Sequence, residues 1–455
     1  MHRLELVLCA VGWLWLGCGS APKPEQPAAS PKPSASPVAE AVPAQAQVAL
    51  PAVAAQQTAT ATDIDKVLAY DPADPLANLE AADELDRLAR GPQGSDEPPA
   101  GGCAVIDGGR RVWPAPGPAA IAAVGRGFVV AGYGQREGRE QLYVVHVPAG
   151  GLPQPITAFD VTPPHPRARV APPGLAARDE NDVTVAYTDG KGRLSVRRLR
   201  VGRGGAGSAA EIATGVDTRF APAVAANQDR MLVAWTVGST PMRVELAVLS
   251  LEGKPLSRHD LTPVSMGASA PSFVAGASPP VLVAVDARAG FSPILRVDLG
   301  SDGTPQPATV ALPLSMIATP PELAAASSSV GTYVAFAGLG SAATSAVGLV
   351  SISPIAGKPE ALVKGTAYGQ LHLAAASAPR AVLVAADAPT QPGKEPPREI
   401  HVHVVGLKGT GPAAVIRGPG SASHAALARD DDGSVGVAFS SAAGVYVAQL
   451  RCDDS

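Results

Sequence analysis

Three polar residues stand at matching places in a repeated part of this 455-residue chain, where they could act on one ligand. Glu322 and His372 each precede the first apolar residue of a short run of small residues, and His424 lies three residues before such a position. Positions one and three before a strand residue share a side of the strand. A carboxylate and two imidazoles that point together could bind a ligand or transfer protons. Unrelated solvated polar residues are the alternative interpretation.

Two further groups have residue types that bind metals. Asp430-Asp431-Asp432 is the densest acidic run, and carboxylate oxygens are calcium ligands. The run lacks the full spacing of a calcium loop and lies where a hairpin turn is expected, so we interpret it as a solvated turn. His401 and His403 alternate on a strand and share one face, but no further metal ligand is obvious nearby. We therefore predict no metal site.

Recognisable catalytic motifs are absent from the sequence. It has no phosphate-binding loop, paired CxxC, HExxH or GxSxG motif, so we predict no cofactor and no assigned catalytic residue. The net charge of −4 argues against nucleic acid as a partner. One basic cluster could contact an acidic partner or a glycan, although a solvated outer strand is the simpler interpretation. It comprises Arg193, Arg197, Arg198, Arg200 and Arg203.

A sequence repeat predicts the strands that carry these candidate residues. The dipeptide Val-Ala ends a short apolar run at intervals of 48 to 55 residues, and its alanines are Ala131, Ala186, Ala234, Ala284, Ala335, Ala385 and Ala438. A period near 50 residues with several short strands per unit predicts a β-propeller, here with seven blades. The high Gly and Pro content, 48 and 46 residues, fits an all-β, turn-rich fold.

Each repeat unit contains four predicted strands. In the third unit, residues 221–226 form a strand of small residues, 231–235 an apolar strand, 244–251 a half-buried strand and 255–261 a polar outer strand. Small residues in the first strand are expected where innermost strands crowd around a central channel. The repeat resembles those of bacterial secreted β-propellers over residues 104 to 451, a resemblance that implies the fold but no particular activity.

The cysteines bear on how the ring closes. The seventh unit ends after its third strand at Arg451, whereas residues 103–113 form a strand without a unit of its own. Placing this strand outermost in the last blade satisfies two open edges. This arrangement predicts that residues 104–112 pair with residues 445–450. It also predicts a disulfide between Cys103 and Cys452, with Cα atoms about 4.4–6.8 Å apart. Two unpaired thiols are the alternative.

The first part of the chain has the pattern of an export signal and a tether. Residues 1–18 contain Arg3 and a short apolar stretch, and Leu16-Gly17-Cys18 resembles the lipidation motif of bacterial lipoproteins, which implies lipid attachment at Cys18. A signal peptide cut slightly later is the alternative. Residues 19–62 are rich in Pro and Ala and predict a disordered linker, and residues 63–91 predict a short helical segment. The propeller is assigned to residues 103–455.

These features predict a cell-envelope binding or scaffold module, displayed by a lipid anchor on a bacterial membrane and facing the periplasm or the cell surface. We expect a monomer whose partner is an unknown protein or glycan, with the membrane contacted through the lipid. The alternative is an enzyme, a glycan hydrolase or lyase with an unrecognised site in the propeller funnel. Fold alone does not separate these classes.

Overall fold

Every element in the described part of the chain is a β-strand, and the strands form antiparallel sets of four. The structure is a computed structural model. It describes residues 102–452 except for 126, 137–138, 164–170, 203–206, 227–228, 239–240, 263–266, 287–293, 313–321, 340–345, 354–359, 365–372, 390–397, 407–408 and 419–420. The predicted signal (1–18), linker (19–62) and helical segment (63–91) therefore lie outside the described residues, as do Cys18 and His372.

The strands are grouped here by their order within each set. The first strands are β2 (Ala119–Ala123), β6 (Gly174–Asp179), β10 (Ala223–Ala226), β14 (Ser269–Ala275), β18 (Leu323–Ser328), β22 (Leu373–Ala378) and β26 (Ser423–Arg429). The second strands are β3 (Gly127–Arg136), β7 (Asp182–Thr188), β11 (Arg230–Val237), β15 (Val281–Val285), β19 (Gly331–Leu339), β23 (Ala381–Pro389) and β27 (Ser434–Ser441). The third strands are β4 (Arg139–Pro148), β8 (Leu194–Arg200), β12 (Arg243–Ser250), β16 (Ile294–Asp298), β20 (Ala346–Ser353), β24 (Arg398–Gly406) and β28 (Gly444–Cys452). The outer strands are β5 (Gln154–Asp160), β9 (Ala210–Ala213), β13 (Pro255–Asp260), β17 (Thr309–Leu312), β21 (Glu360–Lys364), β25 (Gly409–Ile416) and β1 (Cys103–Trp113).

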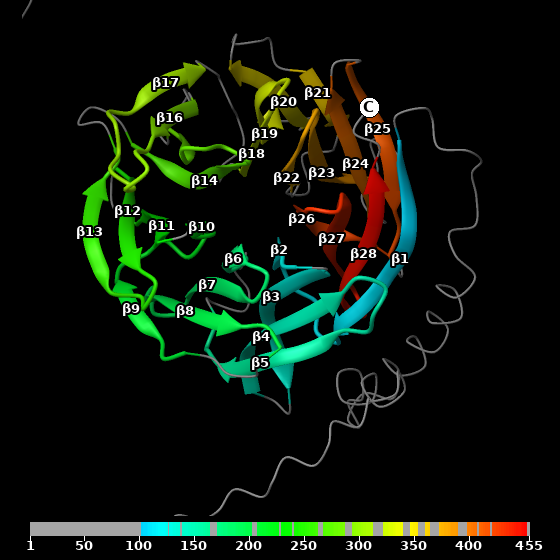
Figure 1. The fold of residues 1–455 in the computed structure, drawn as a ribbon, viewed down its shortest axis with the longest axis horizontal. Coiled ribbons are helices and arrows are strands. Elements are labelled where there is room, and N and C mark those ends of the chain that lie inside the picture. Colours follow the sequence, from blue (N-terminus) through cyan, green and yellow to red (C-terminus); the bar gives the residue numbers. More distant parts are fainter. Residues whose placement is uncertain are drawn as a thin grey trace, which may run out of the picture. The chain divides into compact units, whose positions relative to one another are not determined.

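The sets are arranged radially, with the first strands innermost (Figure 1). Each first strand contacts the next along the chain, from β2 through β6, β10, β14, β18 and β22 to β26, and β26 in turn contacts β2. Two sets join into one eight-stranded sheet through a parallel pairing of β14 with β18. The architecture is therefore all-β and propeller-like.

The Val-Ala repeat marks equivalent positions in these sets. All of its alanines lie on second strands and are at most 3 % exposed. Ala131 pairs with Ala120 on one side and Val144 on the other, and Ala335 pairs with Ala324 and Leu349 in the same way. A small side chain recurs there because neighbouring sheets pack against both faces of the second strand.

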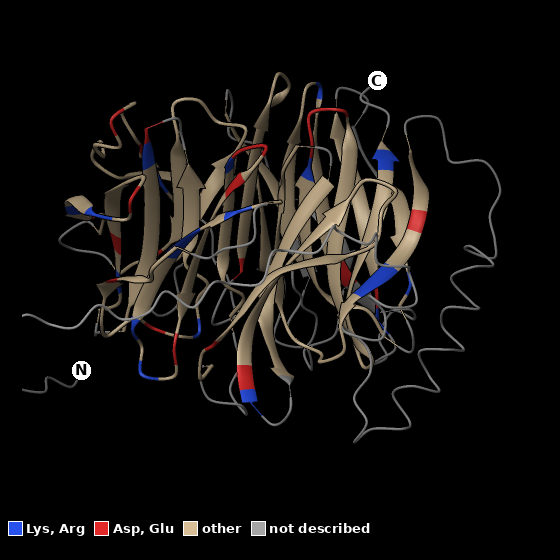
Figure 2. Ribbon diagram, turned by 60° about the horizontal axis from the view of Figure 1, so that its bottom comes forward, with Lys and Arg blue, Asp and Glu red and all other residues tan. Residues whose placement is uncertain are grey.

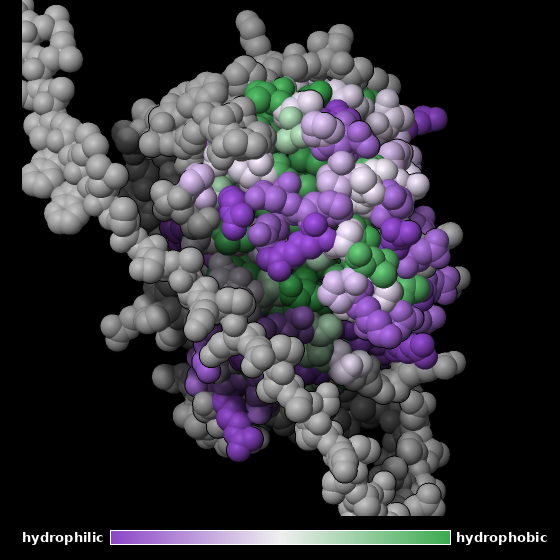
Figure 3. All heavy atoms as spheres, turned by 90° about the vertical axis from the view of Figure 1, so that its left-hand side faces the viewer, coloured by the Kyte–Doolittle hydropathy of each residue, from purple (hydrophilic) through white to green (hydrophobic). Residues whose placement is uncertain are grey.

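The core lies between neighbouring sheets rather than within one of them. One cluster joins Val129 of β3 to Val185 of β7, and another joins Val402 of β24 to Val437 of β27. Burial of these apolar side chains supplies most of the stabilisation of the fold. Many of the charged residues lie near strand ends (Figure 2). On the side that carries β13, hydrophilic side chains surround small apolar areas (Figure 3).

Crowding at the inner strands gives a first prediction. Gly276 follows β14 with a φ of 75°, and a Cβ atom there would meet Ser377 of β22 and the carbonyl oxygen of Ser327 of β18. Gly276→Ala should destabilise the fold by about 2 kcal/mol, through backbone strain and overlap together. Gly150→Ala is the matched control, because Gly150 has a φ of 64° but open space around it. If urea unfolding shows that the two variants lose equal free energy of unfolding, the inner strands are not crowded at Gly276.

The predicted disulfide is present in the structure. Cys103 and Cys452 are bonded and pair in register at the ends of β1 and β28, with Cα atoms 4.0 Å apart, slightly closer than expected. The pairing of β1 with β28 includes Val105 with Leu450 and Arg110 with Val447, as the sequence predicted. In the described part of the chain, no helix has the length and hydropathy needed to cross a membrane.

Candidate functional site

A charged depression lies at one end of the sheet formed by β6, β7, β8 and β9. Its volume is about 510 Å³, within the range of small-ligand sites. We call it the Asp182 depression. It is lined by Arg178, Asp179, Asn181, Asp182, Arg198, Arg200, Val201 and Gly202. The β6–β7 turn and the end of β8 supply these residues, because alternate turns of an antiparallel sheet lie at the same end.

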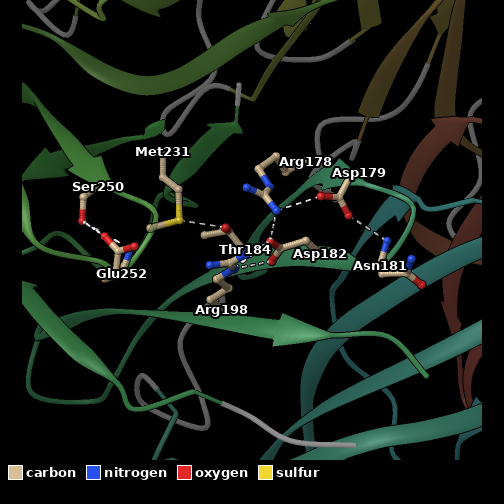
Figure 4. A network of polar contacts seen from close by, with 9 residues as sticks. All are labelled: Arg178, Asp179, Asn181, Asp182, Thr184, Arg198, Met231, Ser250 and Glu252. Carbon is tan, nitrogen blue, oxygen red and sulfur yellow. Dashed lines mark hydrogen bonds and ion pairs between the residues drawn. The ribbon is translucent and has the colours of Figure 1, made fainter. Parts of the chain in front are cut away.

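Asp182 connects the two sides of the depression. Arg178 and Arg198 both point toward its carboxylate (Figure 4). The Nη2 atom of Arg178 lies 2.6 Å from Asp182 Oδ2, and Arg198 donates from Nε to both oxygens at 2.7 Å. Arg198 Nη2 forms a further ion pair with Asp182. The side chain of Asp182 is only 7 % exposed, so two guanidinium groups compensate one buried carboxylate.

Asp179 extends this network toward solvent. Its Oδ2 accepts a hydrogen bond from Arg178 at 2.8 Å, and its Oδ1 accepts one from the backbone N–H of Asn181 at 2.9 Å. The Asn181 hydrogen bond and the positive charge of Arg178 hold the pKa of Asp179 below its usual value. The Asp182 carboxylate raises the pKa of Arg198. Asp179 and Arg198 therefore stay charged at neutral pH.

The network also contacts the next set of strands. Thr184 of β7 donates from Oγ1 to Met231 Sδ of β11 at 2.9 Å (Figure 4). Glu252, after β12, accepts a hydrogen bond from Ser250 at 2.8 Å and interacts electrostatically with Arg198. These contacts fix the depression relative to the neighbouring sheet.

The basic cluster seen in the sequence is only partly what we predicted. Arg197 and Arg198 do face opposite sides of β8, since Arg197 stacks on Phe159 at 4.4 Å while Arg198 binds Asp182. The interpretation as an outer strand is wrong, because β8 is paired on both edges, with β7 and β9. Sequence reasoning missed Arg178 and Asp182, although the charged turn that holds them could have been placed opposite Arg198 and Arg200 by counting hairpin register.

The set of Glu322, His372 and His424 is not assembled by the described residues. Glu322 directly precedes β18, His424 lies in β26, and His372 is outside the described part of the chain. β26 has a register shift between Ser423 and Ala426, and His424 has a φ of 58°. Strict alternation does not hold across such a bulge, so the spacing alone does not orient His424. Starts of first strands lie at the opposite end of the sheets from the Asp182 depression.

His401 and His403 share one face of β24, as predicted, with ring centres 6.2 Å apart. His401 Nε2 lies 2.8 Å from Glu399, which also pairs with Arg417. Burial, and then the nearby His401, lower the pKa of His403 to about 4, so this imidazole is neutral. Within the described ranges, no group of three or more His, Cys, Asp or Glu side chains is placed to hold a metal ion.

The acidic run forms the predicted turn between β26 and β27, but Asp430 is not solvated. It is 4 % exposed, and its Oδ2 atom has no hydrogen-bond donor in the described structure. Burial and the neighbouring Asp432 raise the pKa of Asp430 to about 7, while the hydrogen bond with Asp430 lowers the pKa of Asp432 to about 2.

This pair gives a pH prediction. Between its usual pKa of 3.8 and about 7, Asp430 holds a proton in the folded chain that the unfolded chain releases, so this group's stabilisation declines as pH rises through that window. Asp430→Asn mimics the protonated acid and should flatten the decline. Urea unfolding at pH 5, 6, 7 and 8 measures it. If the free energy of unfolding changes with pH in the same way for the native chain and the variant, Asp430 does not hold the proton.

One of the comparisons with known proteins, that with the BP39L lectin, supports the fold. No protein-family model and no curated protein match the chain. Among solved structures, the BP39L lectin of Burkholderia pseudomallei aligns with a TM-score of 0.51 and 15 % identity, over 73 % of this chain and 96 % of the lectin. A neuraminidase-like protein from a flat-faced bat virus strain has a TM-score of 0.40, with 10 % identity over 78 % and 96 % of the two chains. The NanB sialidase of Streptococcus pneumoniae has a TM-score of 0.39, with 10 % identity over 74 % and 68 %.

Proposed function

We propose that this chain is a glycan-binding module of the cell envelope, held on a bacterial membrane by a lipid at Cys18. The observation that carries the binding role is the Asp182 depression, whose guanidinium and carboxylate groups fix one another in place. Side chains held by ion pairs are preorganised, which lowers the entropy lost when a polar ligand binds. The lectin with a similar fold is consistent with this role.

The proposal includes seven blades, the last closed by β1. Its support is the cycle of contacts among the first strands, together with the place of β1 as the outer strand beside β28, β27 and β26. A closed ring leaves no sheet edge along the inner strands. Export is supported by the Cys103–Cys452 bond, because disulfides persist in oxidising compartments.

Binding fits the depression better than catalysis. A general base needs a carboxylate that is free to accept a proton from the substrate. Asp182 already accepts from two arginines, and Asp179 accepts from Arg178 and Asn181. The carboxylates of the depression therefore act as structural partners of its arginines.

The binding role is tested with the full exported chain on a panel of bacterial envelope glycans. We expect binding to a subset of glycans, and we expect each bound glycan to be recovered intact. Release of shortened products would support the hydrolase or lyase alternative. Binding to no member of the panel would refute the glycan-binding role.

The anchor is tested separately by cell fractionation. The native chain should be found with membranes, and Cys18→Ser should release it, because the lipid is attached through that sulfur. An unchanged membrane fraction for the variant would contradict lipid attachment at Cys18.

A further inference from the structure

We propose that the Asp182 depression recognises the acidic group of a negatively charged glycan, and that Arg200 is the cation that contacts it. This inference rests on the proposed glycan-binding function and names the ligand class of the same site. The lining contains three arginines against two aspartates, so its net charge is positive.

Hydrogen-bond donors are in excess in the depression. A guanidinium group has five N–H donors. Arg178 uses Nη2 for Asp179 and Asp182, and its Nε is buried without a partner in the described structure. Arg198 uses Nε and Nη2 for Asp182. The Nη1 atoms of both arginines make no hydrogen bond to any described residue of the depression.

Arg200 differs from Arg178 and Arg198, which both form ion pairs with Asp182. It is the last residue of β8, it is exposed, and its backbone pairs in register with Asp182. Its side chain makes no ion pair or hydrogen bond with the described residues. Because Arg200 is exposed and lines the depression, its five donors have no acceptor among the residues that the structure describes.

The carboxylates of the depression are already engaged. Asp182 is bound by Arg178 and Arg198, and Asp179 by Arg178 and Asn181. A neutral sugar hydroxyl both donates and accepts, so it finds few acceptors here. A carboxylate only accepts, and it matches the planar fork of a guanidinium in a bidentate pair. The remaining donors therefore favour an acidic sugar.

Two other carboxylates lie near the depression and limit how a ligand enters. Glu180 is exposed in the β6–β7 turn, and Glu252 is held by Ser250 beyond Arg198. Both would repel an anion that approached along their sides. The ligand's acidic group is therefore expected at the end of β8, beside Arg200.

The test uses the exported full-length chain and a glycan array that pairs each acidic glycan with a neutral counterpart. The acidic members carry carboxylate, sulfate or phosphate groups, and each counterpart has the same sugars without the charged group. We expect binding to carboxylate-bearing members, with binding that weakens as sodium chloride is raised to 0.5 M. Arg200→Ala should weaken it by roughly ten- to a hundredfold, and Arg200→Lys by less.

Arg139→Ala is the matched control, because Arg139 is an exposed arginine on β4, outside the depression. It should leave affinity unchanged. Equal binding of acidic and neutral counterparts would overturn this inference and leave the glycan-binding function standing. Acidic binding that Arg200→Ala does not reduce would also overturn it. Binding to no glycan on the array would overturn the proposed function and this inference together.

Discussion

Loss of the Cys103–Cys452 disulfide is expected to lower the melting temperature of the exported protein by up to about 10 °C. The bond joins residues 349 positions apart, and it restricts the unfolded chain more than a bond across a short loop would. On the chain-entropy model the loss is about 5 kcal/mol. β1 would then remain attached to β28 only by strand pairing and side-chain packing.

The double variant Cys103→Ala/Cys452→Ala is the control for reductant effects. Reductant should lower the melting temperature of the native chain toward that of the double variant and should leave the variant unchanged. Calorimetry with and without reductant measures both. Identical melting temperatures for the native and double-variant proteins would contradict a stabilising role for the bond.

Replacing Asp387 by alanine is expected to destabilise the fold by about 3–5 kcal/mol. Asp387 of β23 is fully buried, and its two oxygens accept the backbone N–H groups of His424 and Ala425 at 3.0 and 3.2 Å. Arg398 lies 3.8 Å from the same carboxylate. Alanine would leave these backbone donors of β26 unsatisfied, and it would leave His424 with a φ of 58° without support.

Thr236→Val provides a matched comparison. Thr236 occupies the same place on β11, two residues after the repeat alanine, and its hydroxyl accepts the backbone N–H of Ala270 at 3.2 Å. Ala270 also has a positive φ, 51°. One lost bond between neutral groups should cost about 1 kcal/mol. The proposed role of Asp387 in holding the start of β26 is refuted if chemical denaturation gives Asp387→Ala no larger loss of unfolding free energy than Thr236→Val.

Much of the propeller-like fold could be predicted because one packing problem recurs along the chain. Each second strand lies between two neighbouring sheets, which favours a small buried residue at the same position of each repeat. Examples are Ala131, Ala234 and Ala385. The disulfide followed from counting strands, since one unit lacked an outer strand and Cys103 began a strand without a unit. Both inferences depend on local periodicity and on edges that must be paired.

The candidate site was harder to predict because it depends on pairing between distant side chains. Arg198 was noticed as a charge, but its partner Asp182 is 16 residues away across a hairpin. The burial of Asp430 depends on tertiary packing that a turn sequence does not reveal. The orientation of His424 does not follow from strand alternation, because a bulge interrupts β26 and bulges have no reliable signal in one sequence.

The central claim is that ligand binds at the Asp182 depression. Amide hydrogen exchange of the full chain, with and without a glycan found to bind, tests it most directly. We predict new protection at residues 178–182 and 198–202, with little change at 322 and 424. Protection at 322 and 424 without change at 178–182 would contradict the account and place the ligand at the opposite end of the sheets.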